Sequence, residues 1–545
     1  MNHTPAPQRV CVLNVLLTAA LCLCLAGCAV RDPLLAAPST APASSLAPVD
    51  EVACVRAPAL DAGEELYSEP EAVAGPLEIR LGQAVIMAVQ NNRALRVECL
   101  NPPTSRTFED QERALFDPIL SAELLASRIR ARRESATGAV GSSRSQEVGA
   151  SVGVRQFLPT GTSLAAELST VHEDLLSGRD EFASRLGLSV TQPVLRGFGA
   201  DVNLVRLRQA RLDTQNSEYD LRGFAEALVA DVENTYWEYA LAGQRVKIFE
   251  ESFTLAQQQL DDIRTRIRVG ELAETELAAA QAELALRNEG LINARSQVSS
   301  VRLRLLRLIA PVALAAGQRD VRALTEPAAP DFPMEETAAY IQRALLMRPE
   351  MNQARLAVRR DDLELIRTRN GLLPRMDLFA TLGRTGYADS FGGSARNMAD
   401  GSSYDVVGGL FFEFPPYNRE AEAVHLRARI SRRQSDEALL NLADLVRVDV
   451  ENALIEVERT QEQVRATAAT RQFQEEKLRA ETAKFRVGKS TALLVAATQR
   501  DLVASRVSQV EAVVGHLQAL VSLFRLEGTL LERRGIAAPG AAPEA

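Results

Sequence analysis

The sequence has 545 residues, a formal net charge of −9, 46% hydrophobic residues and only 5% aromatic ones. An acidic chain of this kind argues against a nucleic-acid partner, which requires a basic surface. No stretch after residue 27 offers the ~20 apolar residues that a membrane-spanning helix needs, so the body of the chain can cross a membrane only as strands.

Residues 1–27 have the pattern of a signal peptide. Arg9 supplies a positive charge, and the largely apolar run from Val10 to Leu25 is too short for a membrane span. The segment Leu25-Ala26-Gly27-Cys28 resembles the lipobox of bacterial lipoproteins, in which cleavage before the cysteine leaves a lipidated thiol. We therefore predict lipidation of Cys28, and Ala29 after it favours the outer membrane. The alternative is an ordinary cysteine of the signal peptide.

Residues 28–76 are rich in Ala and Pro, a composition that cannot bury enough apolar surface to order itself, and we predict a flexible tether. Beyond residue 27 the chain contains only Cys28, Cys54 and Cys99, too few for a disulfide scaffold or a zinc pattern. In an oxidising periplasm Cys54 and Cys99 could pair; the alternative is two unrelated thiols.

The first structural repeat is predicted over 77–310. It begins with a short amphipathic helix at 77–89, an extended segment at 95–100 and a helix at 104–116. Alternation of apolar and polar residues then predicts up to four strands within 118–194, each near the length of a tilted membrane strand. A long helical hairpin follows over 201–310, because Pro is absent from 201–269 and Gly270 forms a turn.

The second repeat, over 311–534, follows the same order. Short helices at 334–347 and 349–373 precede two strands within 375–414, which a Gly/Ser-rich loop at 386–403 connects. A second long helical hairpin is predicted over 416–534, with its turn at Gly488. We predict that residues 535–545 form a disordered tail. Roughly 70 helical residues span ~100 Å, so each hairpin is suited to crossing a wide gap.

These motifs resemble the TolC family of outer-membrane efflux proteins, in its lipidated branch. The resemblance covers roughly 77–534. It is carried by the strand-to-helix junction from Gln192 to Gly199, by Arg268-Val269-Gly270 followed by Glu276, and by the echo from Phe485 to Gly488. The resemblance assigns the first strand-to-helix junction to Pro193, Gly197 and Gly199, and in the second repeat Pro415 marks the start of the long helix.

The resemblance implies a mainly α fold with membrane β-strands. Three chains would share one β-barrel in outer-membrane lipid, and duplicated helical hairpins would form a trimeric α-barrel through the periplasm. The implied function is a passive exit duct of a tripartite efflux or type I secretion system. Its partners would be a periplasmic adaptor, which meets the hairpin tips at Gly270 and Gly488, and an inner-membrane pump.

The family often carries acidic residues after its second glycine turn, where they ring the periplasmic entrance. The matching positions here are Leu494 and Ala497, so that ring is missing. In the first repeat Glu276 and Glu283 follow the turn on one helix face. We predict an entrance lined by a single acidic ring at Glu276 beside an apolar collar of Leu494 and Ala497. Ordinary solvation is the alternative for Glu276.

The sequence gives little support for nucleotide binding, metal binding or catalysis. The segment Gly488-Lys489-Ser490-Thr491 resembles the end of a phosphate-binding loop, but Ala483 replaces the required glycine and both flanks are helical. The three histidines beyond residue 27 are far apart in sequence. We therefore predict no enzymatic activity, no metal and no cofactor. The rival function is a lipidated periplasmic adaptor with helical hairpins, against which the duplicated hairpins and the membrane-type strands argue.

Overall fold

The computed structural model describes residues 77–540, with the exception of 135–139, 176–178, 310–319 and 331. The predicted signal peptide at 1–27, the lipidated Cys28 and the tether at 28–76 lie outside the described residues. The predicted combination of long helical hairpins with antiparallel strands is confirmed.

The chain forms two compact units, which we call the strand unit and the helical unit. The described part of the strand unit comprises Asp110–Arg208 and Leu363–Arg429, and the helical unit comprises the remaining described residues. Each unit therefore takes residues from both sequence repeats.

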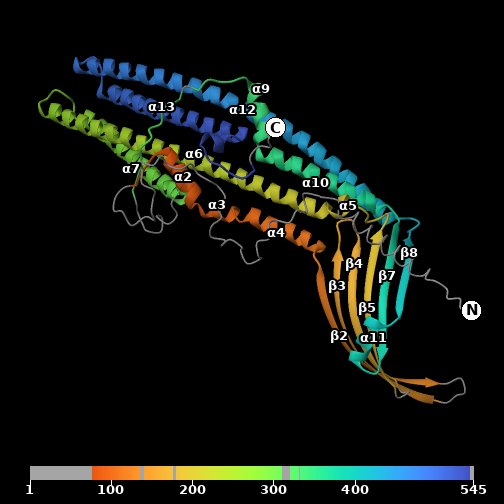
Figure 1. The fold of residues 1–545 in the computed structure, drawn as a ribbon. Helices are drawn as coiled ribbons and strands as arrows, with labels where there is room; N and C mark the ends of the chain where they lie inside the picture. Colours follow the sequence, from red (N-terminus) through yellow and green to blue (C-terminus); the bar gives the residue numbers. More distant parts are fainter. Residues whose placement is uncertain (1–76, 135–139, 176–178, 310–319, 331, 541–545) are drawn as a thin grey trace, which may run out of the picture. The chain divides into compact units, whose positions relative to one another are not determined.

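The strand unit contains one antiparallel sheet of six strands in the order β2-β3-β4-β5-β7-β8 (Figure 1). The strands are β2 (Ile119–Glu134), β3 (Val140–Phe157), β4 (Ser163–Leu175), β5 (Arg179–Pro193), β7 (Arg375–Ala388) and β8 (Tyr404–Glu413). The first repeat supplies four of them and the second repeat two.

The register of the sheet sorts its side chains by polarity, since directly paired residues share a face and neighbours along a strand point to opposite faces. One row across all six strands is wholly apolar and runs Leu120, Val154, Ala166, Leu188, Leu382, Val406. The next row, on the opposite face, is small or charged and runs Ser121, Gly153, Glu167, Gly187, Gly383, Asp405. Around these rows the sheet thus has an apolar face and a polar face, and further along the strands the apolar face also carries Ser184, on which α11 (Phe391–Asp400) packs.

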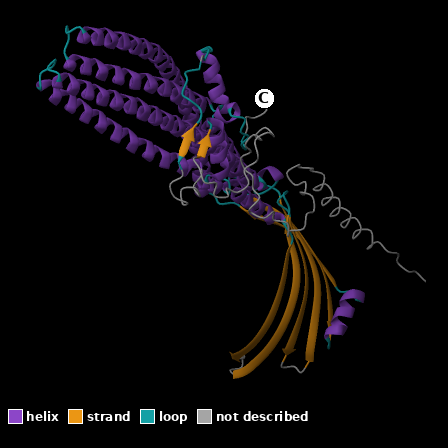
Figure 2. Ribbon diagram, turned by 90° about the vertical axis from the view of Figure 1, so that its left-hand side faces the viewer, coloured by secondary structure: helices purple, strands orange, loops and turns teal. Residues whose placement is uncertain are grey.

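The segment predicted as a loop at 386–403 contains a helix, α11 (Phe391–Asp400), so that prediction is wrong. The Ser390 hydroxyl caps the helix by accepting a hydrogen bond from the Gly393 N–H. The helix packs on the sheet through Ser394, whose hydroxyl lies 2.7 Å from that of Ser184. A side chain at Gly386 would collide with the helix backbone. Capping and packing override the low helix propensity of the Gly-rich sequence, and Figure 2 shows the helix beside the strands.

The helical unit holds most of two long hairpins (Figures 1 and 2). The first consists of α6 (Val205–Arg268) and α7 (Thr275–Ile309), and the second of α12 (Arg419–Arg486) and α13 (Ala492–Glu527). Shorter helices precede the strands and hairpins of each repeat: α2 (Leu81–Asn91), α3 (Arg93–Glu98), α4 (Asn101–Arg113), α9 (Thr337–Met347) and α10 (Pro349–Gly371).

The main core of the helical unit lies where short elements of both repeats meet α6, α7 and α13. The strand β1 (Leu77–Ile79) pairs in parallel with β6 (Val321–Ala323). The buried Tyr236 hydroxyl donates to the Ile79 carbonyl at 3.1 Å and so fixes α6 against this pair. The predicted helix at 77–89 is therefore a strand followed by α2, because Leu77 and Ile79 are used in the parallel ladder.

The segment predicted as extended at 95–100 lies largely in α3, so this prediction is also wrong. The side chain of Asn92 accepts hydrogen bonds from the N–H groups of Ala94 and Leu95 and thereby starts the helix. Cys99 follows α3, is nearly buried and is disulfide-bonded. No other cysteine lies among the described residues, so the partner of Cys99 lies outside them.

The prediction of a disordered tail at 535–545 is wrong for residues 535–540. Ile536 is only 4% exposed and belongs to the main core of the helical unit. The Arg222 guanidinium donates to the Gly540 carbonyl at 3.5 Å. Residues 535–540 are therefore held by packing and hydrogen bonding, and residues 541–545 lie outside the described part of the chain.

Contrary to the expectation that no stretch after residue 27 is apolar enough, one of the described helices, α13, could cross a membrane by length and composition, with a mean hydropathy of 1.3 over its most apolar window. Several of its apolar residues pack inside the protein, since Val514, Leu520 and Leu523 are buried in the cores of the helical unit. This packing is that of a core helix.

Candidate functional site

The two hairpin turns have the same backbone geometry. Gly270 has a φ of 81° and Gly488 a φ of 74°. In the first turn the Gly270 N–H donates to the Ile267 carbonyl at 3.0 Å and the Glu271 N–H to the Arg266 carbonyl at 2.9 Å. This pair of bonds is the Schellman motif, in which a residue in the left-handed conformation ends a helix.

The second turn repeats the motif. The Gly488 N–H donates to the Phe485 carbonyl at 3.1 Å and the Lys489 N–H to the Lys484 carbonyl at 2.8 Å. No atom lies within 4 Å of a Cβ placed at either glycine, so the need for glycine comes from the positive φ and not from crowding. The duplicated Gly turns are thus equivalent in structure as well as in sequence.

Each tip presents the same exposed tripeptide, Arg-Val-Gly. Val269 is 65% exposed and Val487 is 68% exposed, and the preceding Arg268 and Arg486 are exposed as well. An apolar side chain beside a guanidinium at the end of a helical hairpin offers a partner both apolar contact and a charge. In the described part of the chain both valine side chains are therefore largely open to solvent.

Polar contacts brace the second tip from inside. Glu481 is nearly buried and accepts hydrogen bonds from the Ser490 hydroxyl and from the Lys484 ammonium, the latter at 3.1 Å. These two donors, Ser490 first, lower the pKa of the Glu481 carboxyl. Thr491 caps α13 by accepting from the Leu494 N–H at 3.3 Å. Thus Ser490 and Thr491, which sequence reasoning compared with a phosphate-binding loop, hold the turn instead.

The two hairpins touch each other close to their tips. The guanidinium carbon of Arg266 lies 5.8 Å from the centre of the Phe485 ring, within range of a cation–π interaction. Arg266 is also held by Asp262, at 3.1 Å. A groove of ≈ 340 Å³ runs between the hairpins and is lined largely by alanines: Ala256, Ala279, Ala280, Ala282, Ala492 and Ala496.

The predicted entrance residues occupy equivalent places in the two repeats. Glu276 lies in the first turn of α7 and is half-buried, and Leu494 lies in the first turn of α13 and is 49% exposed. Ala497 is half-buried one turn further along α13. Glu283, expected on the same face as Glu276, is instead nearly buried and lies 2.5 Å from Arg287. Only Glu276 of this pair therefore remains as a candidate for the entrance.

The strand-to-helix junction forms a second constructed site, in the strand unit. Gly197 and Gly199 have φ values of 84° and 98°. The side-chain amide of Asn203 donates to the carbonyls of Gly197 at 2.8 Å, Gly199 at 3.0 Å and Pro159 at 3.1 Å. The Gly197 N–H donates to the Asn370 side chain at 2.7 Å. The sequence identified Pro193 and the glycines here but missed both asparagines.

The second repeat builds its junction with another asparagine. After Pro415 and Pro416 the chain turns at Asn418, a non-glycine residue with a φ of 37°. The Asn418 side-chain amide donates to the Leu372 carbonyl at 3.1 Å, and its own carbonyl accepts from the Glu422 N–H at 3.0 Å as α12 begins. Asparagine side chains thus form hydrogen bonds with backbone N–H and carbonyl groups at both points where a strand is followed by a long helix.

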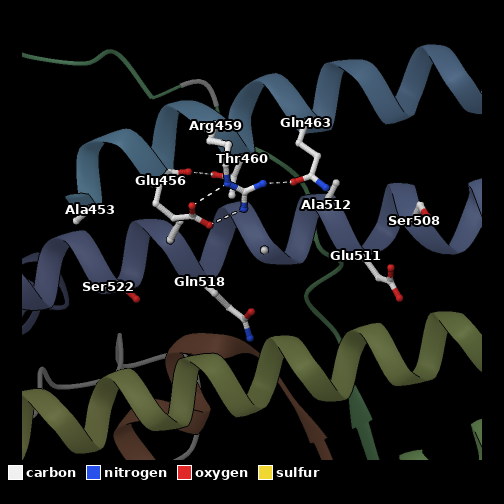
Figure 3. Close-up of a pocket in the computed structure, with 12 residues that line it drawn as sticks. Ala453, Glu456, Arg459, Thr460, Gln463, Ser508, Glu511, Ala512, Gln518 and Ser522 are labelled. Atoms are coloured by element: carbon white, nitrogen blue, oxygen red, sulfur yellow. Dashed lines mark hydrogen bonds and ion pairs between the residues drawn. The ribbon is translucent and has the colours of Figure 1, made fainter. Parts of the chain in front are cut away.

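A second groove on the helices is not built for catalysis. It lies between α12 and α13, has a volume of ≈ 430 Å³ and is lined by Ser, Ala and Gln together with Arg459 and Glu456 (Figure 3). Arg459 pairs with Glu456 at 2.6 Å and donates to Gln463 at 2.7 Å. The hydrogen bond from Arg459 lowers the pKa of the Glu456 carboxyl, which is the reverse of what a general acid needs.

Metal ligands do not cluster in the part of the chain that the structure describes, where no group of three or more His, Cys, Asp or Glu side chains converges. The buried His516 faces the Thr460 hydroxyl, with its Nδ1 at 3.1 Å, and burial lowers the pKa of its imidazole. His425 likewise lies 3.1 Å from the Thr368 hydroxyl. Both histidines are side chains of helix–helix contacts.

The chain is similar to outer-membrane efflux and export proteins. Residues 340–529 match the family model described as outer membrane efflux protein. The chain is 26% identical over 444 residues to the pyoverdine export outer membrane protein OpmQ of Pseudomonas aeruginosa, which covers 78% of this chain and 86% of that protein.

Solved structures are similar over most of the chain. The CmeC outer membrane channel of Campylobacter jejuni aligns with a TM-score of 0.61 and 15% identity, over 88% of this chain and 95% of that one. The open state of the MtrE outer membrane channel of Neisseria gonorrhoeae aligns with a TM-score of 0.56 and 17% identity, over 88% and 99%. Strands and helical hairpins therefore follow one known architecture.

Proposed function

We propose that this chain is an outer-membrane efflux protein of the TolC family, as its match to the efflux-protein family model and its likeness to OpmQ support, and that three copies of it form the exit duct of a tripartite efflux or type I secretion system. In this duct the strand units close one β-barrel in the outer membrane, and the helical hairpins form a passage in the periplasm. An inner-membrane pump supplies the energy and a periplasmic adaptor joins it to the hairpin tips.

The observation that carries this proposal is the polarity of the six-stranded sheet. Its apolar face is exposed in the single chain: Leu120 is 73% exposed, Leu188 48% and Val406 48%. A soluble protein rarely leaves so large an apolar surface uncovered, whereas lipid would cover it. The free edges of an open sheet cannot face lipid either, so copies of the chain must close the barrel.

The hairpin tips support the adaptor as partner. Two equivalent tips per chain, each with an exposed Arg-Val-Gly, would give a trimer a ring of similar docking points. The rival function, a lipidated adaptor, has no use for a membrane-type sheet that exposes an apolar face.

We expect the chain in the outer-membrane fraction as a trimer that dissociates on heating. Detergent extraction followed by gel filtration and by electrophoresis of boiled and unboiled samples measures this. A protein recovered from the periplasm without detergent, or a monomer in detergent, would contradict the duct and favour the adaptor.

Lipidation of Cys28 remains a prediction of this function, motivated by the segment Leu25-Ala26-Gly27-Cys28. Mass spectrometry of the mature protein is expected to show loss of 1–27 and an acylated cysteine at the new N-terminus. Cys28→Ala should leave the precursor uncleaved at this position. An unmodified chain that starts elsewhere would refute the lipid anchor without touching the duct.

The acidic entrance ring is proposed on Glu276, which follows the first tip as Leu494 follows the second. Three carboxylates around one axis attract cations and repel anions. Planar-bilayer recordings are expected to show cation preference in the wild-type trimer and a lower cation-to-anion permeability ratio in Glu276→Gln. The exposed Glu289 on the same helix gives a matched control, Glu289→Gln, which should keep the wild-type ratio. Equal ratios in all three proteins would leave Glu276 as a solvated residue.

A further inference from the structure

We propose that the outer-membrane barrel of this protein uses all six strands of each chain, so that a trimer closes a barrel of eighteen strands in which β8 of one protomer pairs with β2 of the next. This inference rests on the proposed trimeric duct and specifies how its membrane part is built. It concerns the hairpin β2–β3 of the first repeat, which supplies four strands to the sheet where the second repeat supplies two.

The first argument is the pairing of the hairpin with the rest of the sheet. β3 pairs with β4 in a continuous antiparallel register from Gln146 opposite Asp174 to Phe157 opposite Ser163. β2 pairs with β3 over its whole length, from Ile119 opposite Arg155 to Glu134 opposite Val140. The two strands have 16 and 18 residues, more than the ~9–11 that a tilted membrane strand requires. The hairpin is therefore long enough to cross the bilayer and is bonded along its length.

The second argument is that both faces of the sheet continue across the hairpin without a break. On the apolar face Leu120 and Val154 extend the row formed by Ala166, Leu188 and Leu382. Leu124 and Val152 on the same face are 87% and 51% exposed. A hairpin lying outside the barrel, or folded into its lumen, would have no reason to place its apolar side chains on the face that meets lipid.

The polar face shows the same continuity. Ser121 and Gly153 extend the row of Glu167, Gly187 and Gly383. Glu123 lies opposite Ser151, and Ser151 lies opposite Ser169. Small and charged side chains on this face suit a water-filled interior. The alternation of the hairpin is thus in phase with that of the other four strands on both faces.

The third argument is where the free edges lie. Among the described strands of this sheet only β2 and β8 have a neighbour on one side alone. A closed barrel must pair these edges, because unpaired backbone groups cannot face lipid. A barrel that used only β4, β5, β7 and β8 would first have to break the β3–β4 ladder to free the edge of β4. The geometry therefore points to a β8–β2 seam between protomers.

Eighteen strands give the membrane passage the width of a porin. Barrels of 16–18 strands leave an aqueous channel, because the diameter grows roughly linearly with the strand number. The outer-membrane part of this duct would then exert little size selection, which suits bulky cargo.

Cysteine cross-linking across the seam tests the proposal in the full-length protein. Val407→Cys on the polar face of β8 is combined in turn with Ser121→Cys, Glu123→Cys, Leu125→Cys or Ser127→Cys on β2. A matched set combines Val407→Cys with Ala165→Cys, Glu167→Cys or Ser169→Cys on β4. Within one chain β8 is about 24 Å from β2 and about 14 Å from β4, at ~4.8 Å per strand, whereas a disulfide needs Cα atoms within ~7 Å. Every cross-link is therefore between protomers.

After mild oxidation, at least one β8–β2 pair is expected to give covalent trimers on a non-reducing denaturing gel, and the β8–β4 pairs none. Native mass measurement in detergent reports separately whether each variant is a trimer. A trimer that links through β4, or through neither strand, would overturn the eighteen-stranded barrel and leave the duct intact. A native monomer would instead overturn the proposed function itself.

Discussion

Replacement of Gly488 by Pro is expected to abolish export while the trimer still assembles. Proline fixes φ near −65°, whereas Gly488 has a φ of 74°, and proline lacks the N–H that donates to the Phe485 carbonyl. The turn would lose its Schellman motif, and the exposed Val487 beside it would no longer be presented to an adaptor. The cores of the helical unit contain neither residue, so they should remain packed.

A graded series separates backbone strain from loss of a side chain. Gly488→Asn should keep most activity, because asparagine tolerates the left-handed conformation, and Gly488→Ala should cost about 1–2 kcal/mol locally and reduce export in part. Export is measured as growth of a strain lacking the native copy, on toxic compounds to which the wild-type chain restores resistance. Normal growth with Gly488→Pro would show that the adaptor docks elsewhere.

The hairpins and strands could be predicted from the sequence because their signals are local and long. Absence of Pro over 201–269 and 417–487 indicates helix on its own, and alternation within 118–194 indicates strands. The tips could be predicted for the same reason, since Gly270 and Gly488 are turn residues between uninterrupted helical runs.

The predictions from the sequence are wrong for segments whose local structure depends on a single cap or packing contact. The helix α3 depends on the cap by Asn92, and α11 depends on the cap by Ser390 and on packing against Ser184. Residues 535–540 are ordered because Ile536 reaches a core formed by segments distant in sequence. Helix propensity and amino-acid composition contain no information about such contacts.

The junction asparagines could not be predicted for a related reason. Asn203 bonds the carbonyl of Pro159, and Asn370 bonds the Gly197 N–H and, through its amide nitrogen at 3.4 Å, the Leu195 carbonyl. These backbone groups are brought together only by the fold. A single asparagine in a helical sequence gives no sign that it will satisfy backbone groups of a strand-to-helix turn.

The helical unit is also expected to lose stability between about pH 4.5 and pH 8 because of one buried carboxyl. Glu226 is only 3% exposed, and burial raises the pKa of its carboxyl from 4.5 to about 8. Arg222, 3.3 Å away, opposes this shift, and Glu532 and Glu350 add to it. The folded protein therefore holds a proton on Glu226 at neutral pH that the unfolded chain releases.

The sign of the effect follows from this difference in bound protons. Below pH 4.5 both states are protonated and the stabilising contribution is complete, and as the pH rises towards 8 the unfolded state gains from ionising while the folded state does not. A shift of this size corresponds to at most about 5 kcal/mol, at 1.36 kcal/mol per pKa unit. Glu226→Gln, whose amide imitates the protonated carboxyl, should remove this part of the pH dependence and raise the melting temperature at pH 8.5.

Thermal unfolding of the detergent-solubilised protein at pH 5.0 and pH 8.5 measures the effect. Glu456→Gln serves as the matched control, because the Glu456 carboxyl is exposed and its pKa is lowered rather than raised. This control should retain the wild-type fall in melting temperature between the two pH values, whereas Glu226→Gln should show a smaller one. An equal fall in wild type, Glu226→Gln and Glu456→Gln would mean that Glu226 is ionised beside Arg222 in the folded protein, and that the ion pair outweighs burial.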